Sequence, residues 1–143
     1  MGDLPRERPG DVTILDMEAS LEHLSRGTVC NVDALLVVTE PYYRSLETTG
    51  RIVPLARGLG LENVWVVANK VRSARDEAGI REYAVRHHAV LIGVVPFDDN
   101  ITDADRAGQA LIDGAPTAPA VAAIGQVADQ LLERLGTIVP AGR

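Results

Sequence analysis

Three polar segments, each placed directly after an apolar run, hold the residues best suited to chemistry. They comprise residues 16–20, 69–72 and 96–100. In a sheet of parallel strands, ligands bind outside the carboxyl ends of the strands. If the apolar runs are such strands, the three polar segments share one edge of the sheet. We therefore predict the ligand site at that edge.

Asp16 is the candidate magnesium-binding residue. It follows the apolar run Val12–Leu15, and phosphate-transfer enzymes hold magnesium, directly or through water, with an acid at the end of a buried strand. A side chain that only caps the following turn would give the same pattern. The pattern taken alone favours this second interpretation.

Asn69 is the candidate base-reading residue. Its amide can donate and accept a hydrogen bond at once, which suits the edge of a nucleotide base. An asparagine that only forms the turn after a strand fits the pattern equally well. A guanine-specific site would need an acid where Arg72 stands, so recognition of guanine is disfavoured.

The segment after the apolar run Val90–Val95 combines a strand stop with helix-capping residues. Pro96 ends the strand and fixes the backbone beside the candidate base pocket. Asp99 or Asn100 can cap a following helix. This segment carries little information by itself.

A phosphate-binding loop is missing from the sequence. Neither G-x-x-x-x-G-K-[ST] nor G-x-G-x-x-G occurs, and Gly58-Leu59-Gly60 follows a helical pattern, so it reads as a helix stop. Without such a loop, the backbone donors and the lysine that hold the β- and γ-phosphates are absent. No catalytic residue is therefore assigned in these 143 residues.

The remaining candidates give weaker signals. Glu22-His23 and His87-His88 have no second ligand cluster at metal-binding spacing, which favours packed or solvated histidines. Cys30 has no evident activating partner and is expected to be a small buried residue. The segment Tyr42–Arg44 could face a partner or cover its own loop, and the sequence does not decide between these alternatives.

The elements that would position these residues are short strands and amphipathic helices. Runs rich in Val, Ile and Leu predict strands buried on both faces, and helical spacing predicts helices between and after them. Pro54 is expected to kink or shorten the first helix. The predicted strands are Val12–Leu15, Ala34–Val38, Val64–Ala68 and Val90–Val95, and the predicted helices are Ser45–Leu59, Ala74–His88 and Pro119–Leu135. This alternation predicts an α/β fold, a parallel sheet with flanking helices.

Composition fits one globular domain and excludes several classes. The net charge of −6, without clustered basic residues, disfavours a nucleic-acid surface. No apolar run has the length of a membrane span, the polar start is no signal peptide, and a single cysteine fits a reducing cytoplasm. We expect a flexible leader over residues 1–10, a partial nucleotide-switch α/β domain over 11–136, and a tail over 137–143.

Together these segments resemble the CooC-type ATPases. These are MinD/ParA-like accessory proteins, with a deviant Walker A loop, that help insert nickel into carbon monoxide dehydrogenase. The resemblance runs in the family's order from about residue 11 to residue 135. It includes residues 16–28, Val32-Asp33, Glu40-Pro41, Ser45-Leu46, Asn69–Val71, Val95–Asp98 and 104–108.

The resemblance implies a P-loop NTPase-like fold of the SIMIBI/MinD type and roles for matching residues. The acid at the end of the Walker B strand would lie near magnesium, and residues 18–27 would report the γ-phosphate to a dimer partner. An asparagine would contact adenine. The residues so implied are Asp16 at magnesium, Glu18 in the switch, Asn69 and Lys70 at the base, and Pro96, Phe97 and Asp98 along the base pocket.

Two departures from the family matter. Ser20 stands where the family has Gly, which can turn its amide toward a phosphate at backbone angles that Ser avoids. The family's amino-terminal half, with the P-loop strand, a catalytic acid and paired metal-binding cysteines, has no counterpart. Because that strand lies inside the sheet, its loss leaves backbone groups unpaired or makes the remaining strands close ranks.

We therefore interpret the chain as the carboxyl-terminal half of such an ATPase, active only with the missing half. ATP and magnesium binding would be weak or absent in this chain alone. Expected partners are a second copy or the missing half, and a client metalloenzyme, but not nucleic acid or membrane. The alternatives are a non-catalytic dimerisation and client-binding module, or a MinD/ParA-like positioning ATPase, whose amphipathic tail or basic patch is not visible.

Overall fold

The computed structural model describes residues 11–17 and 32–136. Outside the described residues lie the predicted leader (residues 1–10), the predicted switch (residues 18–27) with Glu18 and His23, the predicted tail (residues 137–143), and Cys30. The elements, in chain order, are β1 (Leu35–Thr39), α2 (Tyr43–Gly58), β2 (Val64–Val71), α3 (Ala74–Arg86), β3 (Val90–Pro96), α4 (Asp99–Arg106), α5 (Leu111–Gly114) and α6 (Pro119–Leu135).

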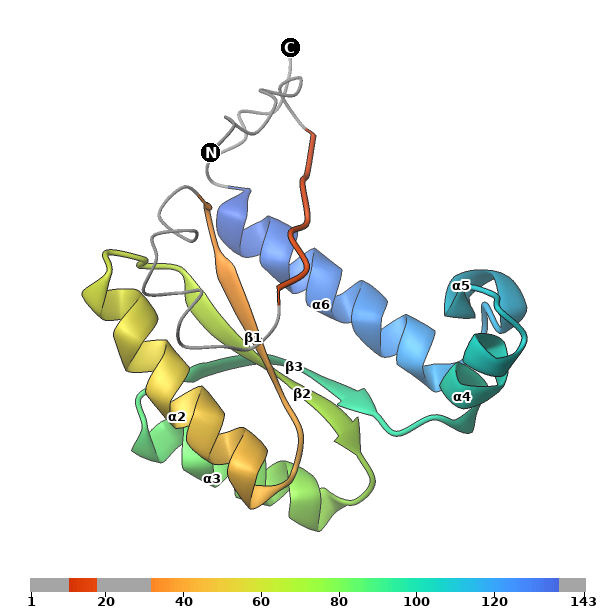
Figure 1. Cartoon of the computed structure of the whole chain (residues 1–143), viewed down its shortest axis with the longest axis horizontal. Helices are drawn as coiled ribbons and strands as arrows, with labels where there is room; N and C mark the ends of the chain where they lie inside the picture. Colours follow the sequence, from red (N-terminus) through yellow and green to blue (C-terminus); the bar gives the residue numbers. More distant parts are fainter. Residues whose placement is uncertain (1–10, 18–31, 137–143) are drawn as a thin grey trace.

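The described strands form one parallel sheet in the order β1-β2-β3. Leu36 is paired with Trp65, and Trp65 with Val90. The central strand β2 is buried on both faces from Val64 to Ala68, as a run of β-branched residues under helices requires. The predicted α/β fold with a parallel sheet and flanking helices is confirmed (Figure 1).

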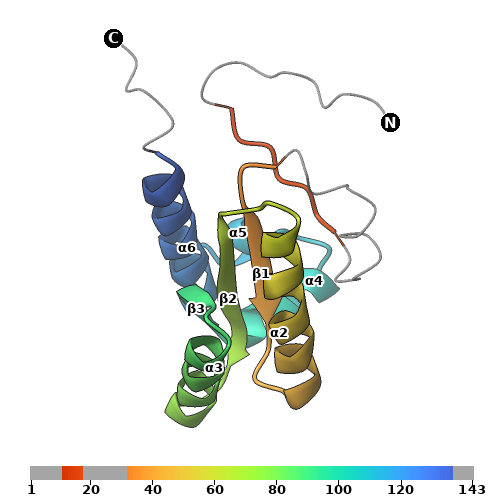
Figure 2. The same cartoon turned by 90° about the vertical axis from the view of Figure 1, so that its left-hand side faces the viewer.

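Helices cover both faces of the sheet. On one face, α2 packs on β1 and β2 around Val53 and Val66, and α3 packs beside it around Ile80. On the other face, α6 packs on β3 through Ala120 and Val127. Figure 2 shows α6 and α2 on opposite sides of the strands. The side chains of β2 alternate between these two cores, as the pleat of a strand dictates.

The face that carries α6 is only partly covered. The side chains of Ile124 and Leu132 on α6 are half exposed, and Val38 on β1 is 58% exposed. Between α6 and β1 lies a depression of about 330 Å³. It is lined by Leu36, Val38, Val67, Asn69, Val95, Ile101, Ile124 and Val127. The apolar face of α6 therefore packs only in part against the described chain.

The prediction of a strand at Val12–Leu15 was wrong. Residues 11–17 contain no strand, and the side chains of Val12 and Ile14 are 62% and 87% exposed. A strand exists only where a neighbour completes its backbone hydrogen bonds. Within the described sheet β1 has one neighbour, β2. Residues 12–15 therefore do not pair directly with β1.

The predicted helices are confirmed with small changes of boundary. The helix α6 begins at Pro119 and ends at Leu135 as predicted, with Pro near its first position where the missing N–H costs nothing. Pro54 does not shorten α2, which continues to Gly58. Among the described helices, none is long and apolar enough to cross a membrane.

Candidate functional site

The carboxyl ends of the three parallel strands lie at one edge of the sheet, and two of the predicted segments lie there. Asn69 and Lys70 belong to the end of β2, and Asp98 lies two residues beyond the end of β3. The strand β2 extends to Val71, so Asn69 lies within the strand and the interpretation of it as a turn residue was wrong. Asp16 is exposed in a segment without a strand, so the structure does not place it at a strand end.

Lys70 joins the ends of β1 and β2. Its Nζ lies 2.5 Å from Oε1 of Glu40, the residue that follows β1. Lys70 has a φ of 55°, in the left-handed region where non-glycine residues are uncommon. Both side chains are partly exposed, so the ion pair adds little to stability. It does set the direction of the Lys70 side chain, which was predicted to lie beside a base.

Arg72 and Phe97 join the ends of β2 and β3. The guanidinium carbon of Arg72 lies 3.3 Å from the centroid of the Phe97 ring. The Phe97 N–H donates a hydrogen bond to the carbonyl of Val71 at 2.9 Å. The Arg72 N–H donates to the carboxylate of Asp76 at 3.0 Å. The two segments are thus held together by backbone and side-chain contacts at once.

Asp98 is buried and binds two helix N-termini. Its Oδ1 accepts from the backbone N–H of Asn100 at 3.0 Å and from the side-chain amide of Asn100 at 2.7 Å. Its Oδ2 accepts from the backbone N–H of Ala120, in the first turn of α6, at 3.0 Å. The cap of α4 is therefore Asp98, and not Asp99 or Asn100 as predicted.

These hydrogen bonds keep the Asp98 carboxylate ionised. The bond from Ala120 is the largest cause that lowers its pKa, burial opposes it, and the bonds from Asn100 lower it further. Three hydrogen bonds to the charged form occupy most of its accepting capacity. Asp98 therefore supports the segment after β3. Its place along a base pocket stays a prediction.

Asn69 offers an amide to a ligand. Its side chain is half-buried and is the single polar member of the 330 Å³ depression. Within the described part of the chain, no hydrogen bond engages this amide. An amide beside apolar side chains can orient a flat heterocycle through its two complementary hydrogen-bonding atoms.

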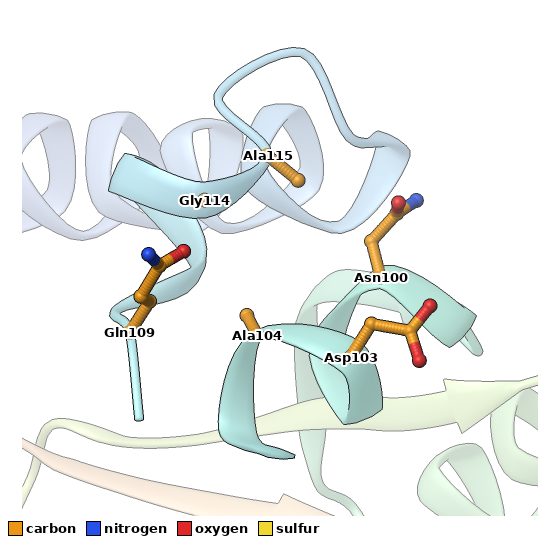
Figure 3. A pocket seen from close by; sticks show the side chains of 6 residues that line it. All are labelled: Asn100, Asp103, Ala104, Gln109, Gly114 and Ala115. Carbon is orange, nitrogen blue, oxygen red and sulfur yellow. The ribbon is translucent and has the colours of Figure 1, made fainter. Parts of the chain in front are cut away.

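A second, smaller depression lies between α4 and α5 (Figure 3). Its volume is about 210 Å³, and it is lined by Asn100, Asp103, Ala104, Gln109, Gly114 and Ala115. The amide of Asn100 is already bound to Asp98. Asp103 is exposed and lies near Arg106. This depression can accept a small polar molecule, but its lining carries no arrangement typical of catalysis.

The weaker candidates occupy ordinary surface positions. His87 stacks on the ring of Tyr83, with the two centroids 4.1 Å apart. Tyr42 and Tyr43 are 57% and 72% exposed, so they do not cover their own loop. The hydroxyl of Tyr43 donates to Glu47 at 2.8 Å, which raises the pKa of Tyr43. Across residues 11–17 and 32–136, no three His, Cys, Asp or Glu side chains gather as a metal site would require.

Sequence reasoning missed the contacts that join the strand ends. The Arg72–Phe97 stack, the Glu40–Lys70 ion pair and the bond from Ala120 to Asp98 each connect segments far apart in sequence. The one usable signal was the placement of polar segments after adjacent parallel strands. That signal predicts that the polar segments lie close together, but it does not predict which side chains contact each other.

Comparison with known proteins confirms the resemblance to CooC-type proteins. The chain is 40% identical over 126 residues to the carbon monoxide dehydrogenase accessory protein CooC of Rhodospirillum rubrum, covering 88% of this chain and 46% of that protein. It is 37% identical over 100 residues to an ATP-binding protein of Methanocaldococcus jannaschii, covering 69% of this chain and 38% of that protein. The chain thus spans less than half the length of these relatives. No family profile matches it.

Solved structures support the fold. The MinD cell division protein of Aquifex aeolicus superposes with a TM-score of 0.65 at 22% identity, over 76% of this chain and 47% of that one. MinD of Pyrococcus horikoshii, solved in complex with Mg-ADP, gives a TM-score of 0.60 at 22% identity, over 77% of this chain and 45% of that one. The described sheet is consistent with a fragment of the MinD/ParA ATPase fold.

Proposed function

We propose that this chain is the base-binding, carboxyl-terminal part of a CooC-like ATPase, and that it hydrolyses ATP only together with a segment that supplies the P-loop. The observation that carries the proposal is the open lateral edge of β1 beside an uncovered apolar face, which Asn69 of the neighbouring strand β2 also lines. The similarity to a CooC protein and to an ATP-binding protein supports it.

The open edge of β1 suits an added parallel strand. Within the described sheet, β1 pairs with β2 on one side only. A strand edge leaves N–H and C=O groups that another strand can bind. Val38 on this strand is 58% exposed, more than a core strand of a finished sheet would allow. A strand added beside β1 would place β1 inside a larger sheet.

The depression between α6 and β1 suits a helix. Parallel strands are connected through crossovers, usually helical, so an added strand brings a helix to one face of the sheet. One face is already occupied by α2 and α3. The other face offers the 330 Å³ depression, whose lining is apolar except for Asn69. Burial of this lining would supply the hydrophobic contribution to assembly.

The added strand would also offer residues 12–15 a strand to pair with. We propose that this run becomes a strand on the far side of the added strand, and that Asp16 then reaches the carboxyl edge to hold magnesium through water. Glu18 would follow it as part of the nucleotide-dependent switch. Asn69 would contact the base of ATP. The Mg-ADP complex of the MinD relative supports the choice of ligand.

The proposed role of the assembled protein rests on a relative. The name of the R. rubrum protein describes it as an accessory protein of carbon monoxide dehydrogenase. We propose an accessory role here as well, and we propose further that an ATP-dependent dimer assists nickel insertion into a client metalloenzyme. The exposed Tyr42 and Tyr43, at the start of α2, are available for contact with a partner.

Reconstitution tests the proposal. The chain and the unmatched remainder of the R. rubrum relative are purified separately, and ATP hydrolysis with magnesium is measured for each and for their mixture. We expect turnover in the mixture alone. Asp16→Asn should abolish this turnover, whereas Asp113→Asn, on the short helix α5, should leave it unchanged. A stable, folded complex without turnover would instead favour a non-catalytic module that binds its client.

A further inference from the structure

We propose that a β-bulge at Asn69 and Lys70 aims the Asn69 amide at the nucleotide base, and that Lys70 is a positioning residue that acts through its backbone. The inference rests on the proposed function, in which Asn69 contacts the base. Three observations carry it: the change of register between β2 and β3, the positive φ of Lys70, and the opposite faces of β2 on which Asn69 and Val71 lie.

The bulge lies at the carboxyl end of β2. The paired positions advance from Ala68 to Val71 in β2, but only from Val94 to Pro96 in β3. The strand β2 therefore has one extra residue within Asn69-Lys70. An extra residue of this kind bends the strand and redirects its side chains, and bulges are frequent beside functional sites.

The extra residue lets β2 meet two packing requirements at once. Val67 and Asn69 line the depression beside α6. Val71 belongs instead to the core under α3, together with Ala68 and Ile80. In a regular strand Asn69 and Val71 would lie on the same face, because side chains alternate with a period of two residues. The bulge thus keeps Val71 buried under α3 while Asn69 faces the depression.

Lys70 contributes to the bulge through its backbone. Its φ is 55°, in the left-handed region that residues other than glycine rarely adopt. Backbone outliers of this kind persist only where the surrounding structure determines them, and they cluster at ligand sites. The Lys70 side chain is bound to Glu40 at the end of β1. What Lys70 supplies to Asn69 is therefore the conformation of the chain, and not a contact with the base.

The amide of Asn69 has two complementary atoms for the edge of adenine. It can donate a hydrogen bond to N7 and accept one from the 6-amino group. Turning the amide away would remove these hydrogen bonds without removing the other contacts of the nucleotide. A nucleotide that lacks the 6-amino group therefore measures the orientation of Asn69 separately from binding as a whole.

The test measures the affinity of the reconstituted complex, with magnesium, for ATP and for purine riboside triphosphate, which lacks the 6-amino group. The variants are Lys70→Val, whose branched side chain opposes a positive φ, and Lys70→Gly, which adopts a positive φ freely. We expect the preference for ATP to fall about fivefold in Lys70→Val, the contribution of one hydrogen bond, and about twofold at most in Lys70→Gly.

The matched control is His88→Val. In the part of the chain that the structure describes, His88 is the other non-glycine residue with a positive φ, at 53°, and it precedes β3 at the opposite edge of the sheet. His88→Val strains the backbone in the same way at a distance from Asn69, so the preference for ATP should stay unchanged. Because this preference is a ratio, partial unfolding of a variant does not imitate the expected result.

Nuclear Overhauser effects in the chain itself report the orientation of Asn69 directly. The wild type and Lys70→Gly should show contacts between the side-chain amide protons of Asn69 and the methyl groups of Val38 and Val67, which line the same depression. Lys70→Val should lose these contacts. Their absence from the wild type would contradict the proposed orientation.

The two proposals fail differently. A preference for ATP that is unchanged in Lys70→Val, or that falls equally in Lys70→Gly, would overturn the role of the Lys70 backbone and leave the proposed function intact. A wild-type complex that binds both nucleotides equally would overturn the inference in the same way. A folded complex that binds neither nucleotide would overturn the proposed function and this inference with it.

Discussion

The carboxylate of Asp98 accepts a hydrogen bond from the backbone N–H of Ala120 at 3.0 Å, across 22 positions of sequence. The same side chain caps α4. One residue at the end of β3 therefore fixes the start of the helix after it and the start of the last helix. The bond ties the first turn of α6 to the segment after β3.

Replacing Asp98 should destabilise the chain more than replacing its neighbour. Asp98→Ala removes three hydrogen bonds and leaves the N–H groups of Asn100 and Ala120 without this acceptor. Asp99→Ala is the matched control, because Asp99 is exposed in the first turn of α4. Urea unfolding should give a clearly lower midpoint for Asp98→Ala. Equal midpoints for the two variants would contradict the double-capping role.

The contribution of Asp98 should depend on pH. Its pKa in the folded chain is lowered from 3.8, chiefly by the bond from Ala120. A lowered folded-state pKa means that the stabilisation is complete above the unfolded-state pKa and is lost as pH falls through the folded-state pKa. The difference in urea midpoint between the wild type and Asp98→Asn should therefore shrink below about pH 4. A difference that stays constant down to pH 2 would argue against an ionised, hydrogen-bonded carboxylate.

Packing between β3 and α6 should tolerate no side chain at Gly93. A Cβ at this position would collide with the side chain of Val127, whereas a Cβ at Gly125, within α6, would meet nothing within 4 Å. We expect Gly93→Ala to cost about 1–3 kcal/mol of unfolding free energy through overpacking. Gly125→Ala should instead stabilise by about 0.5–1 kcal/mol. Chemical denaturation of both variants checks the pair, and a neutral Gly93→Ala would place α6 farther from the sheet.

Assembly with the complementing segment should depend on Val38. Val38 lines the depression and is 58% exposed, so Val38→Lys should leave the stability of the isolated chain nearly unchanged. In the complex this ammonium would be buried without a partner, which costs several kcal/mol. Val85→Lys on α3, where Val85 is 76% exposed, is the control. Co-purification with the segment should fail for Val38→Lys alone. Equal recovery of both variants would contradict the proposal that the segment docks on the depression beside β1.

Much of the fold could be predicted from the sequence, because the signals are local. The three apolar runs that became β1, β2 and β3 are short and rich in β-branched residues, and the periodicity of α6 gave both of its ends. The run at residues 12–15 carries the same local signal and forms no strand. Strand formation needs a neighbour, and a local pattern contains no information about whether a neighbour is present.

The site could be predicted only in outline. That polar segments follow adjacent strands places Asn69 and Asp98 at one edge. The sequence could not show that Asp98 would bind Ala120, or that Arg72 would lie on Phe97, because each contact depends on how two strand ends and a distant helix meet. The predicted caps Asp99 and Asn100 missed by one or two residues, within the usual uncertainty of helix boundaries.

Calorimetric titration of Mg-ATP tests the central claim most directly. The titration is made into the chain alone, into the P-loop-bearing segment alone, and into their purified complex. We expect heat of binding for the complex and none above dilution for the chain alone. Micromolar binding by the chain alone, or no binding by a folded complex, would contradict it.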